Sequence, residues 1–479
     1  MRRLGITTAP AASLVLLLAA CSSGSAPRAR SLLLVTIDTL RADHLSCYGY
    51  ERETSPRLDA FVARGTRFEL GFSASPRTLP SHASLLTGLY PSFHSVGHEN
   101  SRFALEGSFV TLAEHCRAAG MRTAAIVSNP VLHRRSGLAQ GFETYDDRFP
   151  DAEPGRPARE KIAERTASAA LQRLAELAGG RFFLWVHFQD PHGPYAPPAP
   201  FDEAFAGESV TEDLVLAAGD THAGHGELPE YQVLGEERRL AEYVRRYDAE
   251  IRYLDEHLGR VLDALERLGI AGETLVAITA DHGEAFGEDG YYCAHGHGLG
   301  LDQTRVPLVF AGPRVRPGTV LEGPVSNVAV FATALEALGL ADADRQQSAS
   351  LARALEEGSE PGAAFGYAES VTQRAAFGGS PPGWPGWYAR ADARPLSDTG
   401  FWEQHNPYTQ ADYLPLGEAQ LAPLGPGAGT DAPDELRGAL ARFRERAERY
   451  RERSGAAERG EIELSEEERA QMRALGYAD

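Results

Sequence analysis

Two short segments place side chains that bind cations directly after buried apolar runs. Asp38 follows the run 31–37, and Asp281 and His282 follow the run 274–279. Carboxylates and an imidazole at the carboxyl ends of parallel strands converge on one crevice, where they can hold a metal ion. A single aspartate there is equally well explained as a helix cap, so the prediction of a metal site depends on the combination.

A third segment, 75–88, combines a hydroxyl group with a predicted helix start. Thr78 lies just before Pro80 and Ser81. A hydroxyl at that place lies near the positive end of the helix dipole and beside backbone N–H groups, which suits a nucleophile that attacks a tetrahedral anion. Taken alone, the segment is better explained as a Ser/Thr-rich helix cap.

The elements that must position these groups are short buried strands that alternate with helices. Further β-rich apolar runs lie at 122–127, 182–187 and 306–310, and helical patterns cover 56–64, 111–119, 160–178 and 239–268. This alternation predicts an α/β fold, a three-layer sandwich around a mostly parallel sheet. Ligands of such sheets gather at the carboxyl ends of the strands, which is where the candidate residues stand.

Composition and charge narrow the class of partner. The chain has 479 residues, 43% of them hydrophobic, which excludes a disordered, collagen-like or coiled-coil protein. Its 47 Lys and Arg against 67 Asp and Glu give a net charge of -20, which argues against a nucleic-acid partner. The negative charge does not exclude an anionic substrate, since a bound metal reverses the local field.

The first 30 residues have the features of an export and anchoring segment. Residues 1–20 combine a basic start, an apolar run and small residues, which is typical of a secretory signal peptide. The residues before Cys21 resemble a bacterial lipobox, which implies that Cys21 is lipidated, with 21–30 as a tether. The alternative is an ordinary signal peptide followed by a chance cysteine. We expect an exported protein that is lipid-anchored to the bacterial envelope, periplasmic or at the cell surface.

The pattern changes after residue 340. The stretches 378–387 and 423–433 are linker-like, and 435–453 and 464–475 have the pattern of charged helices. We therefore predict a catalytic domain over 31–340 and a smaller C-terminal region over 341–479. The three remaining cysteines, Cys47, Cys116 and Cys293, are an odd number without a recognisable spacing, so they predict no particular disulfide.

Five motifs, taken in order, resemble the sulfatase family of the alkaline-phosphatase superfamily. They are VTIDTLRAD from Val35, PSHASLLTGLYP from Pro80, DPHGPY from Asp190, DHGE from Asp281 and RVPL from Arg305. The resemblance implies an alkaline-phosphatase/sulfatase-like fold over residues 31–340 and metal-dependent hydrolysis of sulfate or phosphate esters.

One departure from the family pattern bears on the mechanism. The sulfatase nucleophile is a formylglycine made from the Cys or Ser of a C/S-x-P-x-R motif, and here Thr78 and His82 stand at its first and last positions. Threonine cannot give formylglycine, because oxidation of its secondary alcohol yields a ketone. Superfamily members that act on phosphate esters use a Thr nucleophile, and the stretch from Asp281 to Gly296 resembles the phosphotransferases among them. The resemblance thus favours phosphoester hydrolysis or phosphoryl transfer by Thr78 over formylglycine chemistry.

The resemblance also implies a metal site. Asp38, Asp281 and His282 would hold a divalent ion, with Thr78 as fourth ligand and metal-bound nucleophile. Zinc, manganese and calcium are all compatible with these ligands, although Thr39 stands where the family often has a further metal-binding Asp, which weakens calcium. We expect one metal site rather than two.

Other residues are matched to substrate contacts. His192 aligns with a family histidine that contacts the ester or leaving group, and either His295 or His297 lies where the family has another acid. Arg41, Arg77 and His82 are candidate substrate-binding residues, although an ion-paired or surface role suits the two arginines equally well.

The expected substrate is an anionic ester carried by a glycan, a lipid head group or a small molecule. The alternative is a catalytically silent lipoprotein that binds metal or ligand and keeps the sulfatase fold. Loss of the family's Cys and Arg favours that alternative, whereas retention of Asp38, Asp281, His282 and His192 argues against it.

Overall fold

The computed structural model describes residues 28–340 with gaps at 95, 97–103, 151–155, 157, 212–213 and 220–223. Beyond them it describes 349–361, 366–369, 373–378, 387–392, 420–423, 442, 445–446, 449 and 465–474. The predicted signal peptide and Cys21 therefore lie outside the described residues, as does most of the predicted helix 435–453. Cys47, Cys116 and Cys293 are free thiols.

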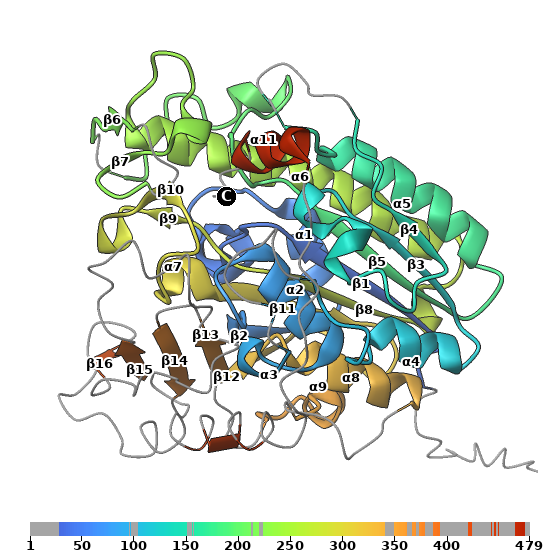
Figure 1. Cartoon of the computed structure of the whole chain (residues 1–479). Coiled ribbons are helices and arrows are strands. Elements are labelled where there is room, and N and C mark those ends of the chain that lie inside the picture. Colours follow the sequence, from blue (N-terminus) through green and yellow to red (C-terminus); the bar gives the residue numbers. More distant parts are fainter. Residues whose placement is uncertain are drawn as a thin grey trace, which may run out of the picture.

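An eight-stranded sheet forms the centre of the molecule (Figure 1). Its order is β12-β2-β11-β8-β1-β5-β3-β4. The strands are β1 Ser31–Ile37, β2 Thr66–Phe72, β3 Arg122–Ile126, β4 Thr144–Asp146, β5 Phe182–Phe188, β8 Thr274–Ala280, β11 Arg305–Ala311 and β12 Thr319–Ser326. Strand β11 runs antiparallel to β8 and β2, while the other neighbours pair in parallel. The predicted α/β class with a mostly parallel sheet is confirmed.

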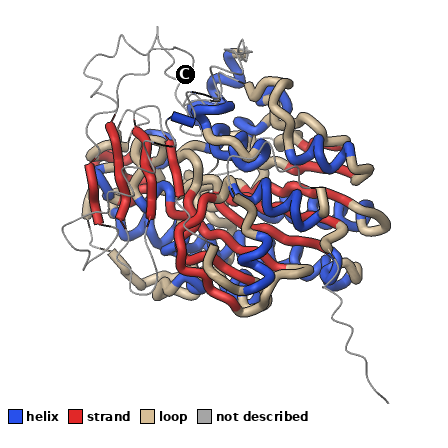
Figure 2. Tube along the Cα trace, turned by 90° about the horizontal axis from the view of Figure 1, so that it is seen from below, coloured by secondary structure: helices blue, strands red, loops and turns tan. Residues whose placement is uncertain are grey.

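Helices cover both faces of this sheet, and Figure 2 shows the helices and strands from below. One face packs against α1 Pro56–Val62, α5 Ala163–Leu177 and α6 Leu240–Arg267, and the other against α2 Thr78–Thr87, α4 Leu112–Ala118, α8 Ala329–Leu338 and α9 Ala352–Glu357. Along β1, Leu33 and Val35 join the first core and Leu32 and Leu34 the second, because successive strand side chains point to opposite faces. Burial on both faces explains the continuous apolar run of this strand.

The remaining elements are short. They are α3 Pro91–His94, α7 Leu301–Thr304, β6 Ala217–Ala218, β7 Glu227–Leu228, β9 Ala285–Phe286 and β10 Tyr292–Ala294. In the C-terminal region a four-stranded sheet has the order β13-β14-β15-β16, formed by Gly366–Glu369, Gln373–Gly378, Trp387–Asp392 and Gln420–Pro423. The linker-like composition of this region does not predict these strands.

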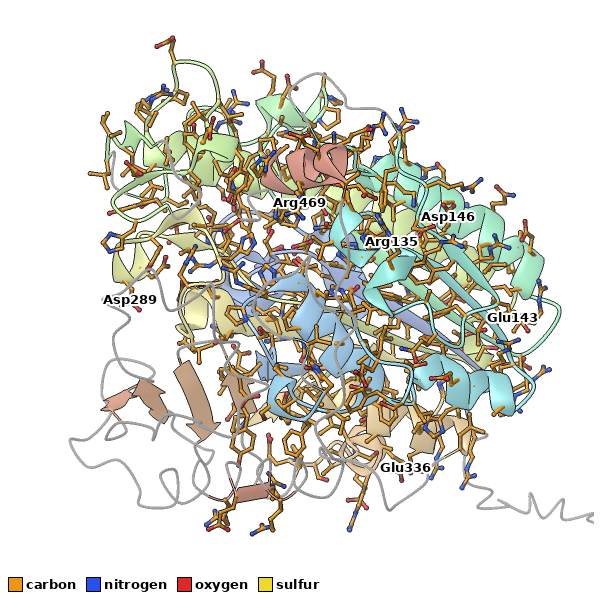
Figure 3. All side chains as sticks on the ribbon, in the orientation of Figure 1. Arg135, Glu143, Asp146, Asp289, Glu336 and Arg469 are labelled. Atoms are coloured by element: carbon orange, nitrogen blue, oxygen red, sulfur yellow. The ribbon has the colours of Figure 1, made fainter. Side chains whose placement is uncertain are left out.

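The last described element, α11 (Glu466–Ala474), corresponds to the predicted helix 464–475. Gln471 of α11 accepts a 2.7 Å hydrogen bond from the backbone of Arg159, and Glu468 forms an ion pair with Arg135, which lies below α11 in Figure 3. None of the helices that the structure describes is long and apolar enough to cross a membrane.

Candidate active site

The register of the two central strands brings the predicted metal ligands together. Ile37 of β1 pairs with Ala280 of β8, so the next residues, Asp38 and Asp281, leave the sheet side by side. The backbone N–H of Asp281 still donates to Ile37 (3.3 Å), and that of Asp38 donates to Phe188 of β5 (3.0 Å). Both carboxylates are completely buried at the carboxyl edge of the sheet, as expected for polar residues that directly follow parallel strands.

His282 presents one ring nitrogen to both carboxylates. Its Nδ1 donates to the carbonyl of Gly283 (3.0 Å), which leaves Nε2 with its lone pair. This Nε2 lies 3.7 Å from Oδ1 of Asp38, 3.6 Å from Oδ2 of Asp281 and 3.3 Å from Oγ1 of Thr78. An imidazole that donates its other N–H to a backbone carbonyl has the arrangement typical of a metal ligand.

Thr78 is the first residue of α2, and its position follows from the local sequence. Arg77 stands at the N-cap position with extended backbone angles (φ -140°, ψ 146°), and Pro80 lies in the first turn, where a missing N–H costs nothing. The Thr78 side chain is fully buried beside the first N–H groups of the helix. A negatively charged group next to its hydroxyl would be stabilised by those N–H groups.

The donor set fits a divalent cation. Oδ1 of Asp38 and Oδ2 of Asp281 are buried and have no hydrogen-bond partner among the described residues. Burial and the nearby Asp38 raise the pKa of Asp281 well above its usual value, whereas His192, His187 and His282 outweigh burial and lower that of Asp38. Two adjacent buried carboxylates with bare oxygens are costly unless a cation neutralises them.

His82 lies close to Asp281, but its ring proton occupies the nitrogen that faces this carboxylate, so His82 is not placed to be a metal ligand. The indole N–H of Trp185 donates to Oγ1 of Thr36 (2.9 Å), so the Thr36 hydroxyl is free to donate to Nε2 of His82 (3.0 Å). The proton of His82 is then on Nδ1, which donates to the carbonyl of Thr78 (2.8 Å) and lies 3.7 Å from Oδ2 of Asp281. Burial lowers the pKa of His82 well below its usual value, which keeps the ring neutral.

His187 of β5 is excluded by the same reasoning. Its Nδ1 accepts a hydrogen bond from the backbone N–H of Ser128 (3.3 Å), and burial lowers its pKa, so the neutral ring carries its proton on Nε2. That Nε2 faces Oδ2 of Asp38 at 3.5 Å. Although His82, His187 and Asp281 are close enough to share a metal ion, the hydrogen-bond partners make the two histidines donors.

Two further groups hold the carboxylates in place. Asn129, which follows β3, donates to Oδ2 of Asp38 (3.0 Å). Thr39 adopts a left-handed backbone conformation (φ 53°) that is uncommon for a threonine, and its N–H donates to Oδ1 of Asp281 (3.3 Å). The hydroxyl of Tyr247 donates to the carbonyl of Thr39 (2.7 Å) and helps to hold this strained turn.

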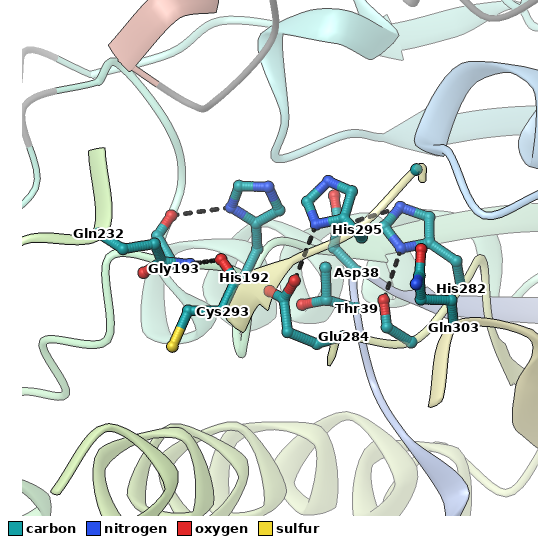
Figure 4. A network of polar contacts seen from close by, with 12 residues as sticks. Asp38, Thr39, His192, Gly193, Gln232, His282, Glu284, Cys293, His295 and Gln303 are labelled. Carbon is teal, nitrogen blue, oxygen red and sulfur yellow. Dashed lines mark hydrogen bonds and ion pairs between the residues drawn. The ribbon is translucent and has the colours of Figure 1, made fainter. Parts of the chain in front are cut away.

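A row of imidazole rings leads away from the metal ligands (Figure 4). The ring centroid of His295 lies 4.5 Å from that of His282 and 5.2 Å from that of His192. Nδ1 of His295 is 3.1 Å from Oε1 of Glu284, whereas Nδ1 of His192 donates to the carbonyl of Gly193 (2.8 Å). The two predicted catalytic histidines His192 and His295 therefore lie together beside the metal-ligand set.

The other predicted site residues lie as follows. Arg77 packs over Gly296, whose φ of 85° favours glycine; a Cβ there would lie 2.5 Å from the Arg77 Nε, so the Arg77 side chain would have to shift. Arg41 is buried and forms ion pairs with Asp43 (2.9 Å) and Glu288 (2.9 Å). His297 stacks on Tyr291 with centroids 4.7 Å apart.

The loop that carries His192 is held by a buried cluster of charges. Arg156 forms ion pairs with Glu160 (2.5 Å), Asp190 (2.7 Å) and Glu250 (2.5 Å), and all four side chains are at most 3% exposed. Asp190 belongs to the same DPH motif as His192. The cluster thus ties this motif to α6 and to the segment before α5.

Sequence reasoning did not assign Asn129, His187, Glu284 or Tyr195 to the site. Asn129 follows β3 at the same edge of the sheet, so a search for polar residues just after each predicted strand would have found it. His187 was hidden inside a run counted as apolar. Glu284 and Tyr195 belong to quoted motifs, but the hydrogen bond between them joins two motifs that lie 89 positions apart.

The parallel sheet with this group of residues at its carboxyl edge defines an α/β ester hydrolase with an alkaline-phosphatase-like fold. The sulfatase family model matches residues 30–340, and the chain belongs to the sulfatase family. The enzymes of this family are metal-dependent hydrolases of sulfate and phosphate esters.

Individual relatives are distant. Choline-sulfatase of Rhizobium meliloti is 26% identical over 355 residues, which cover 65% of this chain and 68% of that protein. A protein solved with its substrate D-glucosamine-2-N, 6-O-disulfate has a TM-score of 0.65 at 17% identity, covering 89% of this chain and 99% of that one. Phosphonate monoester hydrolase of Agrobacterium radiobacter has a TM-score of 0.61 at 20% identity, covering 88% and 96%. The two structural similarities establish the fold.

Proposed function

We propose that this protein is a metal-dependent hydrolase of phosphate esters in which Thr78 is the nucleophile. The observation that carries the proposal is the place of Thr78, whose Oγ1 lies 3.3 Å from Nε2 of His282 at the first turn of α2. A threonine at the formylglycine position cannot become an aldehyde hydrate, so the hydroxyl itself must attack. Phosphoryl groups are transferred readily through such an oxygen ester, which favours phosphate over sulfate.

Asp38, Asp281 and His282 would hold the divalent cation, with Thr78 beside them. When bound, the ion lowers the pKa of the Thr78 hydroxyl and neutralises charge on the non-bridging ester oxygens. A mixed set of oxygen and nitrogen donors suits zinc or manganese better than calcium, which prefers oxygen alone.

The side chains perform the remaining steps. After its proton has passed to water, Oγ1 of Thr78 bonds to phosphorus as the bond from phosphorus to the leaving oxygen breaks. The rings of His192 and His295 lie next to that of His282, and one of these two histidines protonates the leaving oxygen. Arg77, next to Thr78 and partly exposed, is placed to contact an anionic substrate. Water then hydrolyses the phospho-threonine.

The relatives include enzymes for both phosphorus and sulfur esters. The phosphonate monoester hydrolase supports phosphorus chemistry on this fold, while choline-sulfatase supports sulfate esters. The natural substrate class that we propose is a glycan, lipid head group or small molecule with an anionic ester.

The test is turnover of matched aryl phosphate, phosphate diester, phosphonate and sulfate substrates, with zinc, manganese or calcium added in turn. We expect the phosphorus esters to be hydrolysed and Thr78→Ala to lose at least about 10³-fold in kcat, with partial activity in Thr78→Ser. A phosphoryl group should be found on Thr78 by mass spectrometry after rapid quenching. Sulfate release that depends on Thr78 would instead identify a sulfatase, and unchanged turnover in Thr78→Ala would exclude Thr78 as nucleophile.

We also propose that the protein is exported and anchored to the bacterial envelope through a lipid on Cys21. The lipobox-like residues before Cys21 support this, and negative charge on the chain does not oppose it. The full-length protein should fractionate with membranes, and Cys21→Ser should release it. Equal membrane association of both forms would contradict the anchor.

A further inference from the structure

Glu284 belongs to the motif that carries Asp281 and His282, but its carboxylate contacts other groups. Oε1 lies 3.1 Å from Nδ1 of His295, and Oε2 accepts a hydrogen bond from the hydroxyl of Tyr195 (3.0 Å). The Glu284 side chain is fully buried. Both of its oxygens therefore have a defined partner, and the carboxylate is held in one orientation.

The backbone of Glu284 is held as firmly as its side chain. Nη1 of Arg41 donates to the Glu284 carbonyl (2.9 Å), and the Arg41 guanidinium is in turn fixed by ion pairs with Asp43 and Glu288. Arg41 thus acts on the site through Glu284, which accounts for its burial so close to the metal-ligand set.

The contact with Glu284 determines which atom of His295 is left for a substrate. Because Nδ1 is engaged by Glu284, Nε2 is the ring nitrogen that can reach a ligand, and the ring lies between those of His282 and His192 (Figure 4). Nδ1 of His192, in contrast, donates to a backbone carbonyl, that of Gly193. A carboxylate held by two partners fixes the orientation and the tautomer of an imidazole, so the Glu284 contact sets the direction in which Nε2 of His295 points.

We propose that Glu284 is a positioning residue that makes His295 the acid for the leaving group, an inference that rests on the proposed phosphoester hydrolysis. In this step the Nε2–H bond of His295 breaks, and its proton forms the O–H bond of the departing alcohol as the bond from phosphorus to oxygen breaks. The N–H electron pair stays on Nε2, and the proton shared by Glu284 and His295 remains on Nδ1. During hydrolysis of the phospho-threonine, Nε2 takes a proton from the attacking water.

The dependence on leaving group distinguishes this role from a purely structural one. A nitrophenolate departs without help, whereas an alkoxide needs a proton. Loss of a positioned acid therefore slows alkyl esters selectively, but general damage to the site slows all esters alike.

The experiment compares wild type, Glu284→Gln and His295→Ala on phosphate esters whose leaving groups range from 4-nitrophenol to simple alcohols. In both variants we expect kcat on the alkyl esters to fall by about 10²-fold relative to wild type, and kcat on the nitrophenyl ester by less than about threefold. The double variant should equal His295→Ala, and Tyr195→Phe should show the same trend more weakly. Glu288→Gln is the matched control, because Glu288 pairs with Arg41 but not with His295. Any change in kcat that it causes, relative to wild type, should be the same for all leaving groups.

A second readout does not need turnover. The proton shared between Glu284 and His295 should give a downfield NMR signal that is absent in His295→Ala and displaced in Glu284→Gln. Equal losses on all leaving groups, or selective losses in His192→Ala but not in His295→Ala, would overturn the proposal. If wild type hydrolyses none of the esters, the proposed function fails, and an NMR signal unaffected by Glu284→Gln would then overturn the pairing separately.

Discussion

Nε2 of His282 and Oγ1 of Thr78 lie 3.3 Å apart, although 204 positions separate the two residues along the chain. One follows a central strand and the other begins a helix on one face of the sheet. Their proximity places the proposed metal ligand beside the proposed nucleophile, and the first two predictions test the metal site to which His282 belongs.

Removal of the His282 imidazole should weaken metal binding more than removal of a residue that only hydrogen-bonds a ligand, such as Asn129. We expect His282→Ala to lower the affinity for zinc or manganese by more than about 10²-fold, and Asn129→Ala, which frees only Oδ2 of Asp38, by about 10-fold to 10²-fold. Competition titration with a chromophoric chelator measures both. Affinity equal to wild type in His282→Ala would remove His282 from the ligand set.

The number of bound ions tests the assignment of ring protons. Because the protons of His82 and His187 lie on the nitrogens that face the carboxylates, we expect one ion per chain by elemental analysis after dialysis. His187→Gln should leave that number unchanged, since it alters only a donor to Asp38. Two ions in wild type that fall to one in His187→Gln would show that His187 is a ligand.

The Arg156 cluster should contribute strongly to stability. Arg156→Met leaves the buried carboxylates of Glu160, Asp190 and Glu250 without their cation, and we expect a loss of about 3–5 kcal/mol in the free energy of unfolding. Arg148→Met is the matched control, since Arg148 is 85% exposed in its pair with Asp146 and its loss should leave the stability close to that of wild type. Urea denaturation measures both, and equal small losses would contradict the prediction.

His94 should make stability depend on pH. It is buried, its Nδ1 accepts from the backbone of Val96 (3.1 Å), and burial lowers its pKa to about 3. Below about pH 6.5 the unfolded chain binds a proton that the folded chain does not, so the free energy of unfolding falls by up to about 1.4 kcal/mol per pH unit between pH 6.5 and 3.

The comparison that isolates this effect is His94→Gln, measured by denaturation with chelator present at pH 7, 6 and 5. The wild type should lose more stability than the variant as the pH falls. Parallel pH dependences in the two proteins would show that His94 does not contribute.

Much of the site was predictable because it follows from local patterns. The apolar runs of β1 and β8 identify buried strands, and the polar residues directly after them, Asp38, Asp281 and His282, must lie at the same edge. The order of the motifs identified the family, and the Thr78 substitution was visible in the residues themselves.

The roles of the individual histidines could not be predicted from residue type. His82, His187, His282 and His295 are all buried near carboxylates, and any of them is a plausible ligand or acid. What distinguishes them is the partner of the second ring nitrogen: Thr36 for His82, Ser128 for His187, Gly283 for His282 and Glu284 for His295.

The sequence by itself therefore determined the strands, the edge of the sheet and the set of reactive side chains, because burial and strand ends depend on neighbours along the chain. Only the tertiary structure shows which ring nitrogen of each histidine is left for a metal ion or a substrate, and why Arg41 is buried. The physical reason is that the proton of a neutral imidazole lies on whichever nitrogen meets an acceptor. Which groups meet each ring is set by the folded chain: Thr36 and Ser128 are far from His82 and His187 in sequence, and Glu284 meets His295 across a turn of 11 residues.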